Sequence, residues 1–258
     1  MNKKYQLIVD TYDDFSKTYK SAFIGIPKGF GGLEEDYFGT LKKFKKLYPN
    51  FKAKNKIPTV LFMHGSAGLN KGVKYREWIV KEAKFIFFAP NSFIVKNRPT
   101  YETPTKLANY EKVHKFRQAE IHYNLEKLQK ISFIDINNIF LMGNSEGGLA
   151  AASFKGREFK GRIITAYSCE NSYYSKNFEI GANKDEPFLN IIGTHDQYFA
   201  NEAKATEDHE VQGHCTKALM KHKNAKVIIL PQTKHDITTN IYVKDDIINF
   251  LKFWSKEK

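Results

Sequence analysis

One stretch of the chain decides its fold, and it runs Asn138-Ile139-Phe140-Leu141-Met142-Gly143-Asn144-Ser145-Glu146-Gly147-Gly148-Leu149-Ala150-Ala151-Ala152. An apolar run leads into a glycine-flanked turn, and small residues follow, which is the order strand, sharp turn, helix. The turn matches Gly-x-Ser-x-Gly, and in this setting the pattern predicts a nucleophile elbow with Ser145 at its tip. Glycine neighbours let the helix pack closely on the strand, while the serine occupies strained backbone. The alternative is a loop that is merely flexible.

Similar apolar runs occur on both sides of this stretch. They occupy residues 59–63, 85–89, 163–167, 188–192 and 227–230. Helical segments are expected between them at 75–83, 106–130 and 200–224, with a last helix at the C-terminus. In the segment 106–130, one arc of the helix carries Leu107, Tyr110, Val113, Ile121, Leu125 and Leu128. In the C-terminal helix, one arc carries Ile241, Ile247, Ile248, Leu251 and Trp254. Strands that alternate with helices predict an α/β fold with a doubly wound, mostly parallel sheet.

The N-terminal part of the chain is less regular. Residues 1–56 are interpreted as an irregular or β-rich lead-in, with short strands at 5–9 and 21–26 and an exposed lysine-rich connection at 40–56. Residues 57–258 form the expected catalytic core. No repeat or low-complexity linker separates the two parts, so 1–258 is expected to be a single domain.

The composition fits a globular protein with a strongly basic surface. The 258 residues carry a formal net charge of +13, and 41% are hydrophobic. The lysines are scattered, and no nucleic-acid-binding motif surrounds the densest run, at 42–46, so we expect a solvated basic surface and no nucleic-acid partner. Attraction to anionic substrates or membranes is the alternative.

Hydropathy gives a first expectation about location. No stretch approaches the roughly 20 apolar residues of a membrane span. The basic start of the chain is followed by too short an apolar segment for a signal peptide, so a cytoplasmic protein is expected. The sequence does not indicate the oligomeric state.

Two further strand ends carry the partners that a catalytic serine needs. His235 follows the last strand and is the predicted base, and Asp196 follows the strand at 188–192 and is the predicted acid that orients His235. The order serine, acid, histidine is the one expected for this architecture. Asp185 and Asp236 are the alternatives for the acid, but Asp236 is the direct neighbour of the histidine, which gives an unfavourable geometry.

The turn after residues 59–63 reads His64-Gly65-Ser66-Ala67-Gly68. Its backbone can point an N–H group at a substrate carbonyl oxygen, and together with the N–H of Glu146 it would complete an oxyanion hole. Ser66 is the first choice for this donor and Ala67 the second. We expect His64 to orient the turn.

A metal site is a competing interpretation of the same histidines and aspartates. His64, His195-Asp196 and His235-Asp236 could supply ligands for zinc. None of them has the helical His-Glu-x-x-His spacing, and the triad accounts for the same residues with better local context. Neither a metal nor an organic cofactor is therefore expected.

With these motifs the chain resembles the α/β-hydrolase superfamily, and within it the dienelactone hydrolase-like family. The resemblance covers about residues 57–255. It rests on four segments, namely residues 64–68, 89–93, 143–148 and 193–196, together with Arg117 and His235. It implies an α/β-hydrolase fold with a serine nucleophile. Two departures are Ser145, where enzymes that open dienelactones use cysteine, and Asn91, where the family commonly has aspartate. The first favours general ester or thioester chemistry over the namesake activity.

The resemblance also bears on the two cysteines. Cys169 and Cys215 sit at places where some exported relatives have cysteines that could pair. A disulfide between them would tie down the loop that carries Asp196 and would favour a periplasmic or exported protein. The alternative is two reduced thiols in a cytosolic protein.

These observations predict a serine hydrolase that acts on a small-molecule acyl substrate, either an ester, a thioester or a lactone. Residues 91–101 and the loop 169–174 are expected to form pocket walls under a small lid. Arg98 is a candidate to pair with a substrate carboxylate, and Tyr173 a candidate to contact the substrate. A small serine peptidase and a non-catalytic binding protein on the same scaffold are the alternatives.

Overall fold

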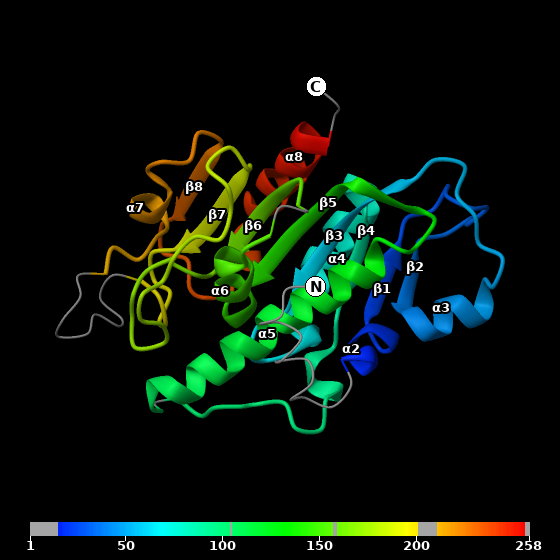
Figure 1. The fold of residues 1–258 in the computed structure, drawn as a ribbon. Helices are drawn as coiled ribbons and strands as arrows, with labels where there is room; N and C mark the ends of the chain where they lie inside the picture. The colour runs from blue at the N-terminus through cyan, green and yellow to red at the C-terminus, as the bar shows by residue number, and fades with distance from the viewer. Residues whose placement is uncertain (1–14, 104, 157–158, 201–210, 256–258) are drawn as a thin grey trace.

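The computed structural model describes residues 15–103, 105–156, 159–200 and 211–255, so the strand expected at 5–9 lies outside the described residues. Figure 1 shows a twisted sheet with helices on both faces. Within the described residues, eight strands pair in the order β2-β1-β4-β3-β5-β6-β7-β8. They are β1 (Phe23–Ile26), β2 (Tyr37–Thr40), β3 (Ile57–Met63), β4 (Ile86–Ala89), β5 (Ile134–Asn144), β6 (Gly161–Thr165), β7 (Phe188–Gly193) and β8 (Ala225–Leu230). β1 is antiparallel to β2 and β4, and the other pairs are parallel.

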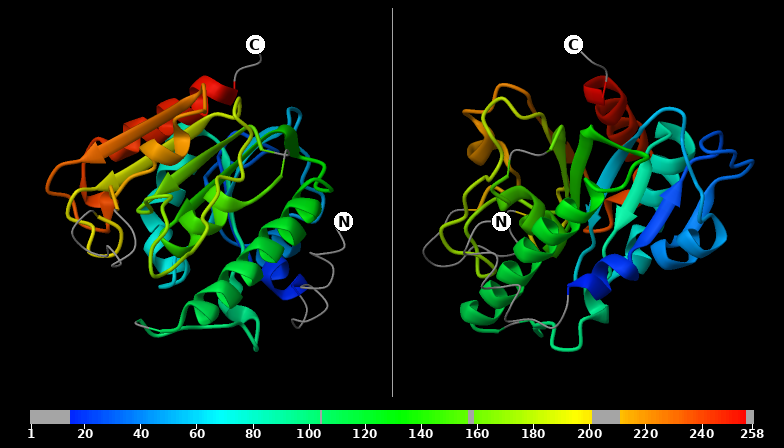
Figure 2. Two further views of the ribbon diagram at one scale, coloured as in Figure 1. Left: turned by 60° about the vertical axis from the view of Figure 1, so that its left-hand side comes forward. Right: turned by 45° about the vertical axis from the view of Figure 1, so that its right-hand side comes forward.

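Helices cover both faces of this sheet (Figure 2). They are α2 (Ser16–Lys20), α3 (Leu41–Leu47), α4 (Val73–Trp78) with the π-helical turn η2 (Ile79–Ala83), α5 (Leu107–Leu128), α6 (Glu146–Ser153), α7 (Thr216–Leu219) and α8 (Val243–Ser255). Short 3₁₀ turns occur at η1 (Leu69–Gly72), η3 (Ser92–Ile94) and η4 (Ile237–Thr239). Among the described residues, no helix combines the length and the apolar character that crossing a membrane requires.

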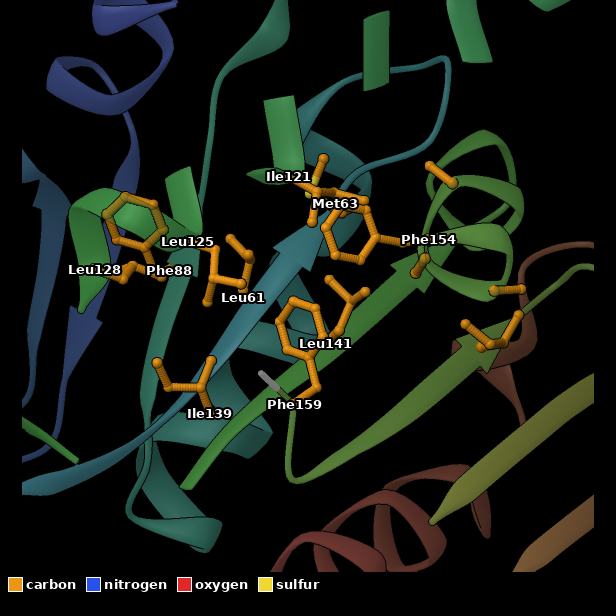
Figure 3. Packing of buried hydrophobic residues seen from close by; sticks show 14 of the residues in the cluster. Leu61, Met63, Phe88, Ile121, Leu125, Leu128, Ile139, Leu141, Phe154 and Phe159 are labelled. Carbon is orange, nitrogen blue, oxygen red and sulfur yellow. The ribbon is translucent and has the colours of Figure 1, made fainter. Parts of the chain in front are cut away.

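The apolar strands are explained by burial on two faces. Along β3, Leu61 and Met63 point to the side of α3, α5 and α6, while Val60 and Phe62 point to the side of α4 and α8. Figure 3 shows the first of these layers, in which Leu61 of β3 and Leu141 of β5 pack with side chains of α5. The continuous apolar pattern therefore predicted these strands correctly, and the sheet is doubly wound and mostly parallel as expected.

The lysine-rich segment at 40–56 is not the exposed connection that the sequence predicted. It contains α3, whose Leu41 and Phe44 are both buried. Their spacing of three residues places them on one helix face, while the lysines between them face solvent. Phe44 packs edge-on against Phe51 and Phe133, with ring centroids 5.1 and 6.1 Å apart. The lead-in thus belongs to the main core, and its β1 and β2 extend the sheet.

Two predictions near the C-terminus also need correction. Of the helix expected at 200–224, the described part, 211–224, contains only the four-residue α7. Its single buried residue is Leu219, and Met220 beyond it is 75% exposed, so no apolar stripe supports a longer helix. Ile241 was assigned to the buried arc of the last helix, but it precedes α8 and is 76% exposed.

The carboxyl ends of the parallel strands meet at one edge of the sheet, toward which their arrowheads point in Figure 1. The turns that follow β3, β5, β7 and β8 carry all three residues of the predicted triad and the predicted oxyanion donor Ser66, and the other predicted donor, Glu146, begins α6. A site built from distant parts of the sequence is the usual result of this topology.

Candidate active site

Ser145 lies on a strained turn between β5 and α6. Its φ and ψ are 57° and −120°, a conformation that residues with a side chain rarely adopt. The turn is held because the Ser145 N–H donates to the Thr165 carbonyl at 3.0 Å. A Cβ at Gly143 would collide with the carbonyl of Gly147, and one at Gly147 would collide with that of Met63. Both glycines are therefore required by the close approach of strand and helix.

Asp196 and His235 form a hydrogen-bonded pair at the neighbouring strand ends. The distance between His235 Nδ1 and Asp196 Oδ2 is 2.7 Å, and Asp196 is fully buried. The other carboxylate oxygen accepts the N–H groups of Tyr198 and Phe199 at 2.8 and 3.1 Å. Three donors thus fix the carboxylate against Nδ1, so the free Nε2 of His235 can act as a base.

The two competing acids have other partners. Asp185 is exposed and pairs with Lys223 at 3.1 Å. Asp236 accepts from the N–H and hydroxyl of Thr238 and begins the 3₁₀ turn η4. Neither carboxylate is therefore placed to orient His235.

One cavity of about 650 Å³ joins the predicted triad and the predicted oxyanion donors. Ser145 and His235 both line it, and Asp196 lies behind His235. The remaining lining residues include polar and aromatic side chains, and they are Gly65, Ser66, Ala67, Lys71, Tyr75, Tyr101, Thr103, His114, Asn144, Glu146, Leu149, Tyr174, Gln197, Tyr198, Phe199 and Asp236.

The turn after β3 lies at this cavity. The Gly65 carbonyl accepts the Gly68 N–H at 3.0 Å and lies 2.7 Å from His64 Nδ1, which fixes the turn. Ser66 and Ala67 are exposed and line the cavity. On the other side, α6 has its first hydrogen bond from the Leu149 N–H to the Ser145 carbonyl, so the Glu146 N–H precedes the helical ladder. Both predicted donors are thus at the cavity.

His64 is buried beneath the turn and is not a candidate base. Burial, followed by the charge of Arg117, holds the pKa of His64 well below its ordinary value. Its neutral ring bonds to the Gly65 carbonyl through Nδ1 and to the Ser92 hydroxyl, 2.9 Å from Nε2. This geometry fits the role expected for His64, which is to orient the turn.

Arg98 does not take the place that the sequence suggested. Its side chain is 4% exposed, is not among the cavity lining, and pairs with the Glu146 carboxylate at 2.6 Å. Arg117 lies 3.7 Å from the same carboxylate and 2.9 Å from Glu120. The guanidinium of Arg98 therefore neutralises a buried acid next to the predicted nucleophile, and it does not face the cavity where a substrate carboxylate would lie.

Tyr174, rather than its neighbour Tyr173, lines the cavity. The two rings pack together with centroids 3.9 Å apart, and Tyr173 lies behind. Tyr101 lines the cavity from the other predicted wall, residues 91–101. The two wall segments were thus expected from the sequence, but the inward-facing residue of the second was not.

His114 is a cavity residue that the sequence analysis missed. It lies on α5 four residues after the buried Tyr110 and three before the buried Arg117. This spacing places it on the inward arc, which is the signal that could have identified it. Burial lowers its pKa to about 4, so the imidazole is neutral at pH 7.

Cys169 and Cys215 form a disulfide, the pairing that the resemblance implied. Cys169 follows β6, and Cys215 begins α7, so the bond joins the loops after β6 and β7. The second of these loops also carries Asp196. Within the described ranges, no three His, Cys, Asp or Glu side chains gather in a group that could hold a metal ion.

Comparisons with known proteins place this fold. No protein-family model matches the sequence, and the search of curated proteins finds no match. Among solved structures, a Bacillus cereus carboxylesterase superposes with a TM-score of 0.53 at 18% identity, over 83% of this chain and 98% of its own. Est1E from Butyrivibrio proteoclasticus gives 0.51 at 15% identity, over 91% and 92%.

A protein assigned as a dienelactone hydrolase, from Klebsiella pneumoniae, gives a TM-score of 0.54 at 13% identity, over 80% of this chain and 90% of its own. Likeness at such low identity concerns the fold and not the reaction. The strand order, the elbow between β5 and α6, and these neighbours together show that the chain has the α/β-hydrolase fold, which it shares with esterases and dienelactone hydrolase-like proteins.

Proposed function

We propose that the protein is a serine hydrolase that cleaves a small ester, thioester or lactone through Ser145, His235 and Asp196. One observation carries this proposal: a serine on a strained elbow opens into the same cavity as a histidine whose Nδ1 lies 2.7 Å from a buried carboxylate. Strained backbone at a non-glycine residue persists when the surrounding structure enforces it, and such sites cluster where chemistry occurs.

In the first half of the reaction, Ser145 Oγ attacks the acyl carbonyl carbon while His235 Nε2 takes its proton. The Asp196 carboxylate accepts the Nδ1–H and stabilises the imidazolium. The oxygen of the tetrahedral intermediate accepts the N–H groups of Glu146 and of Ser66, or of Ala67 in place of Ser66. When the intermediate collapses, the leaving group receives the proton from His235.

In the second half, water attacks the acyl-enzyme. His235 takes a proton from this water, the same N–H groups hold the oxyanion, and the acid leaves as Ser145 regains its proton. The position of Glu146 on the first turn of α6 supports this role, because the helix N-terminus carries partial positive charge. The buried Arg98–Glu146 pair fixes that turn.

Hydrolysis of p-nitrophenyl esters from acetate to octanoate tests the proposal. Wild type is expected to hydrolyse at least the short esters with saturation kinetics, and Ser145→Ala to fall to the background rate. Ser255→Ala is the matched control, because Ser255 ends α8, is not part of the cavity lining, and donates its hydroxyl to the Lys252 carbonyl. Equal rates for wild type and Ser145→Ala would contradict the proposal.

The disulfide bears on where the protein works. Disulfides persist in oxidising compartments and are rare in the reducing cytosol. The Cys169–Cys215 bond therefore favours the periplasmic or exported alternative over the expected cytoplasmic location. Thiol labelling of the protein in cells without reductant tests this point, since two reactive thiols would restore the cytoplasmic expectation.

A further inference from the structure

His114 is a polar side chain in the cavity for which the proposed reaction has no use. It lines the cavity together with the predicted nucleophile, and within the described residues its imidazole has no hydrogen-bond partner. A polar group taken out of water without a partner costs free energy, and most such groups are satisfied in folded proteins. In the free protein, water in the cavity is the partner left to the imidazole, and a bound substrate that displaces this water has to replace its hydrogen bond.

The contacts of α5 locate His114 along the cavity. Four residues later, Gln118 donates to the Ala150 carbonyl and the Ser153 hydroxyl of α6, both at 2.9 Å. Four residues earlier, the ring of Tyr110 packs edge-on against Tyr101 and Tyr174, with centroids 4.7 and 4.9 Å away. Residues four apart share one helix face. His114 therefore lies between the elbow helix and the group of tyrosines.

The walls around this position are aromatic. Tyr101, Tyr174, Tyr198 and Phe199 all line the cavity, and their rings are packed against one another or against their neighbours. These aromatic residues extend to the proposed base, because the ring centroids of Tyr198 and Phe199 lie 4.7 and 5.9 Å from that of His235. Rings held in this way offer edges and faces to an aromatic group of the substrate.

The charges in the cavity argue for an uncharged ligand. The Glu146 carboxylate is neutralised by Arg98, and the other carboxylate of the lining, Asp236, is exposed and accepts from the N–H and hydroxyl of Thr238. The lysine of the lining, Lys71, is exposed on η1, which follows the turn at residues 64–68. A neutral imidazole has one N–H donor and one acceptor nitrogen, which is the complement of a hydroxyl group.

We propose, building on the proposed function, that the cavity takes acyl groups that carry a hydroxylated aromatic ring, and that His114 is the specificity-determining residue that hydrogen-bonds the ring hydroxyl. The ring packs among Tyr101, Tyr174 and Phe199, and the ester carbonyl reaches Ser145. The hydroxyl replaces the water that would otherwise solvate the imidazole.

Paired methyl esters test this inference. Benzoate, phenylacetate and 3-phenylpropanoate are each compared with the corresponding para-hydroxy compound, since the three lengths place the hydroxyl at different depths. For at least one length, the hydroxyl is expected to raise kcat/KM about 10-fold, the contribution of one well-placed hydrogen bond. His114→Leu is expected to reduce this ratio to about 1. His114→Gln, which keeps a donor and an acceptor, is expected to retain part of it.

The outcomes separate this inference from the proposed function. Active sites are counted with a fluorophosphonate, and every rate is expressed per labelled site. If wild type is labelled and hydrolyses the esters, but the hydroxyl group leaves kcat/KM unchanged at all three lengths, the role of His114 is overturned and the proposed hydrolase activity stands. A ratio that survives in His114→Leu also overturns it. A hydroxyl preference seen only with aryl acetates, whose ring is in the leaving group, overturns the acyl assignment. Wild type that the fluorophosphonate does not label refutes the hydrolase itself.

Discussion

At the scale of single residues, Asp196 is the best-defined member of the proposed triad. Its carboxylate is buried and receives the N–H groups of Tyr198 and Phe199 in addition to His235 Nδ1. Such a carboxylate keeps the histidine in the tautomer that leaves Nε2 free to take a proton.

Asp196→Asn is expected to lower kcat by about 10³- to 10⁴-fold with a smaller effect on KM, because the amide favours the wrong tautomer of His235. Steady-state kinetics with a p-nitrophenyl ester measures the change. Asp185→Asn is the matched control, since Asp185 is exposed and pairs only at the surface with Lys223. An equal loss in both variants would contradict the assignment of the acid.

The buried imidazoles predict a loss of stability in acid. The pKa of His114 is lowered from 6.5 to about 4 by burial, and that of His64 is lowered as well. Between pH 6.5 and 4 the unfolded chain binds the proton of His114 and the folded chain does not. The free energy of unfolding is therefore highest above pH 6.5 and falls as the pH drops, by about 3 kcal/mol near pH 4 for His114 alone.

Urea unfolding at pH 7 and pH 4.5 measures this effect. His114→Phe is expected to show a smaller difference between the two pH values than wild type, because one of the titrating groups is gone. If the variant loses as much stability as wild type, the acid sensitivity has another source.

At the scale of elements, a buried ion network joins α5, α6 and the segment after η3. Arg98 and Arg117 both approach the Glu146 carboxylate, and Arg117 also pairs with Glu120 and donates to the His64 carbonyl at 2.7 Å. This network connects α6 to the turn at residues 64–68. It thereby fixes the two backbone segments that we propose to bind the oxyanion.

Arg98→Met is expected to lower the free energy of unfolding by about 3 kcal/mol, because it removes a cation from a buried carboxylate and leaves that charge poorly compensated. Chemical denaturation measures the loss. Arg98→Met combined with Glu146→Gln is expected to recover part of it, since the unpaired charge is removed. The explanation would be contradicted if the free energy of unfolding of the double variant were lower than that of Arg98→Met by as much as the loss of a second buried ion pair.

The elements also show which features local sequence can predict. The strands at 59–63 and 188–192 were predicted because both of their faces are apolar, a pattern that depends on the strand alone. The helix α3 was missed because Leu41 and Phe44 are few among lysines, and the burial of Phe44 depends on Phe51, which lies beyond the helix, and on Phe133, which is distant in sequence. The pairing of Arg98 with Glu146 could not be predicted from local sequence either, because it joins distant parts of the chain.

At the scale of the whole molecule, the fold follows from one local pattern, an apolar strand that ends in a turn, which is repeated along the chain. The elbow, the oxyanion turn and the positions of Asp196 and His235 were expected from the strand and turn pattern, because parallel strands bring their carboxyl ends together. The interior of the cavity was not expected. The inward direction of His114 and Tyr174 depends on how α5 packs against α6 and against the tyrosine rings.

The disulfide is expected to contribute to the stability of the whole domain. It joins residues 46 apart in sequence, and closing such a loop in the unfolded chain corresponds to at most about 4 kcal/mol. Scanning calorimetry with and without reductant is expected to show a lower Tm for the reduced protein. Cys215→Ala, which cannot form the bond, is the control and should not respond to reductant. A Tm that is the same under both conditions would contradict a disulfide in solution.

The central claim is that Ser145 is an activated nucleophile, and intact-mass spectrometry after a fluorophosphonate tests it most directly. Wild type is expected to gain the mass of one probe adduct, while Ser145→Ala, shown to be folded by its Tm, gains none. A folded wild type without an adduct, or an adduct that persists in Ser145→Ala, would contradict the claim.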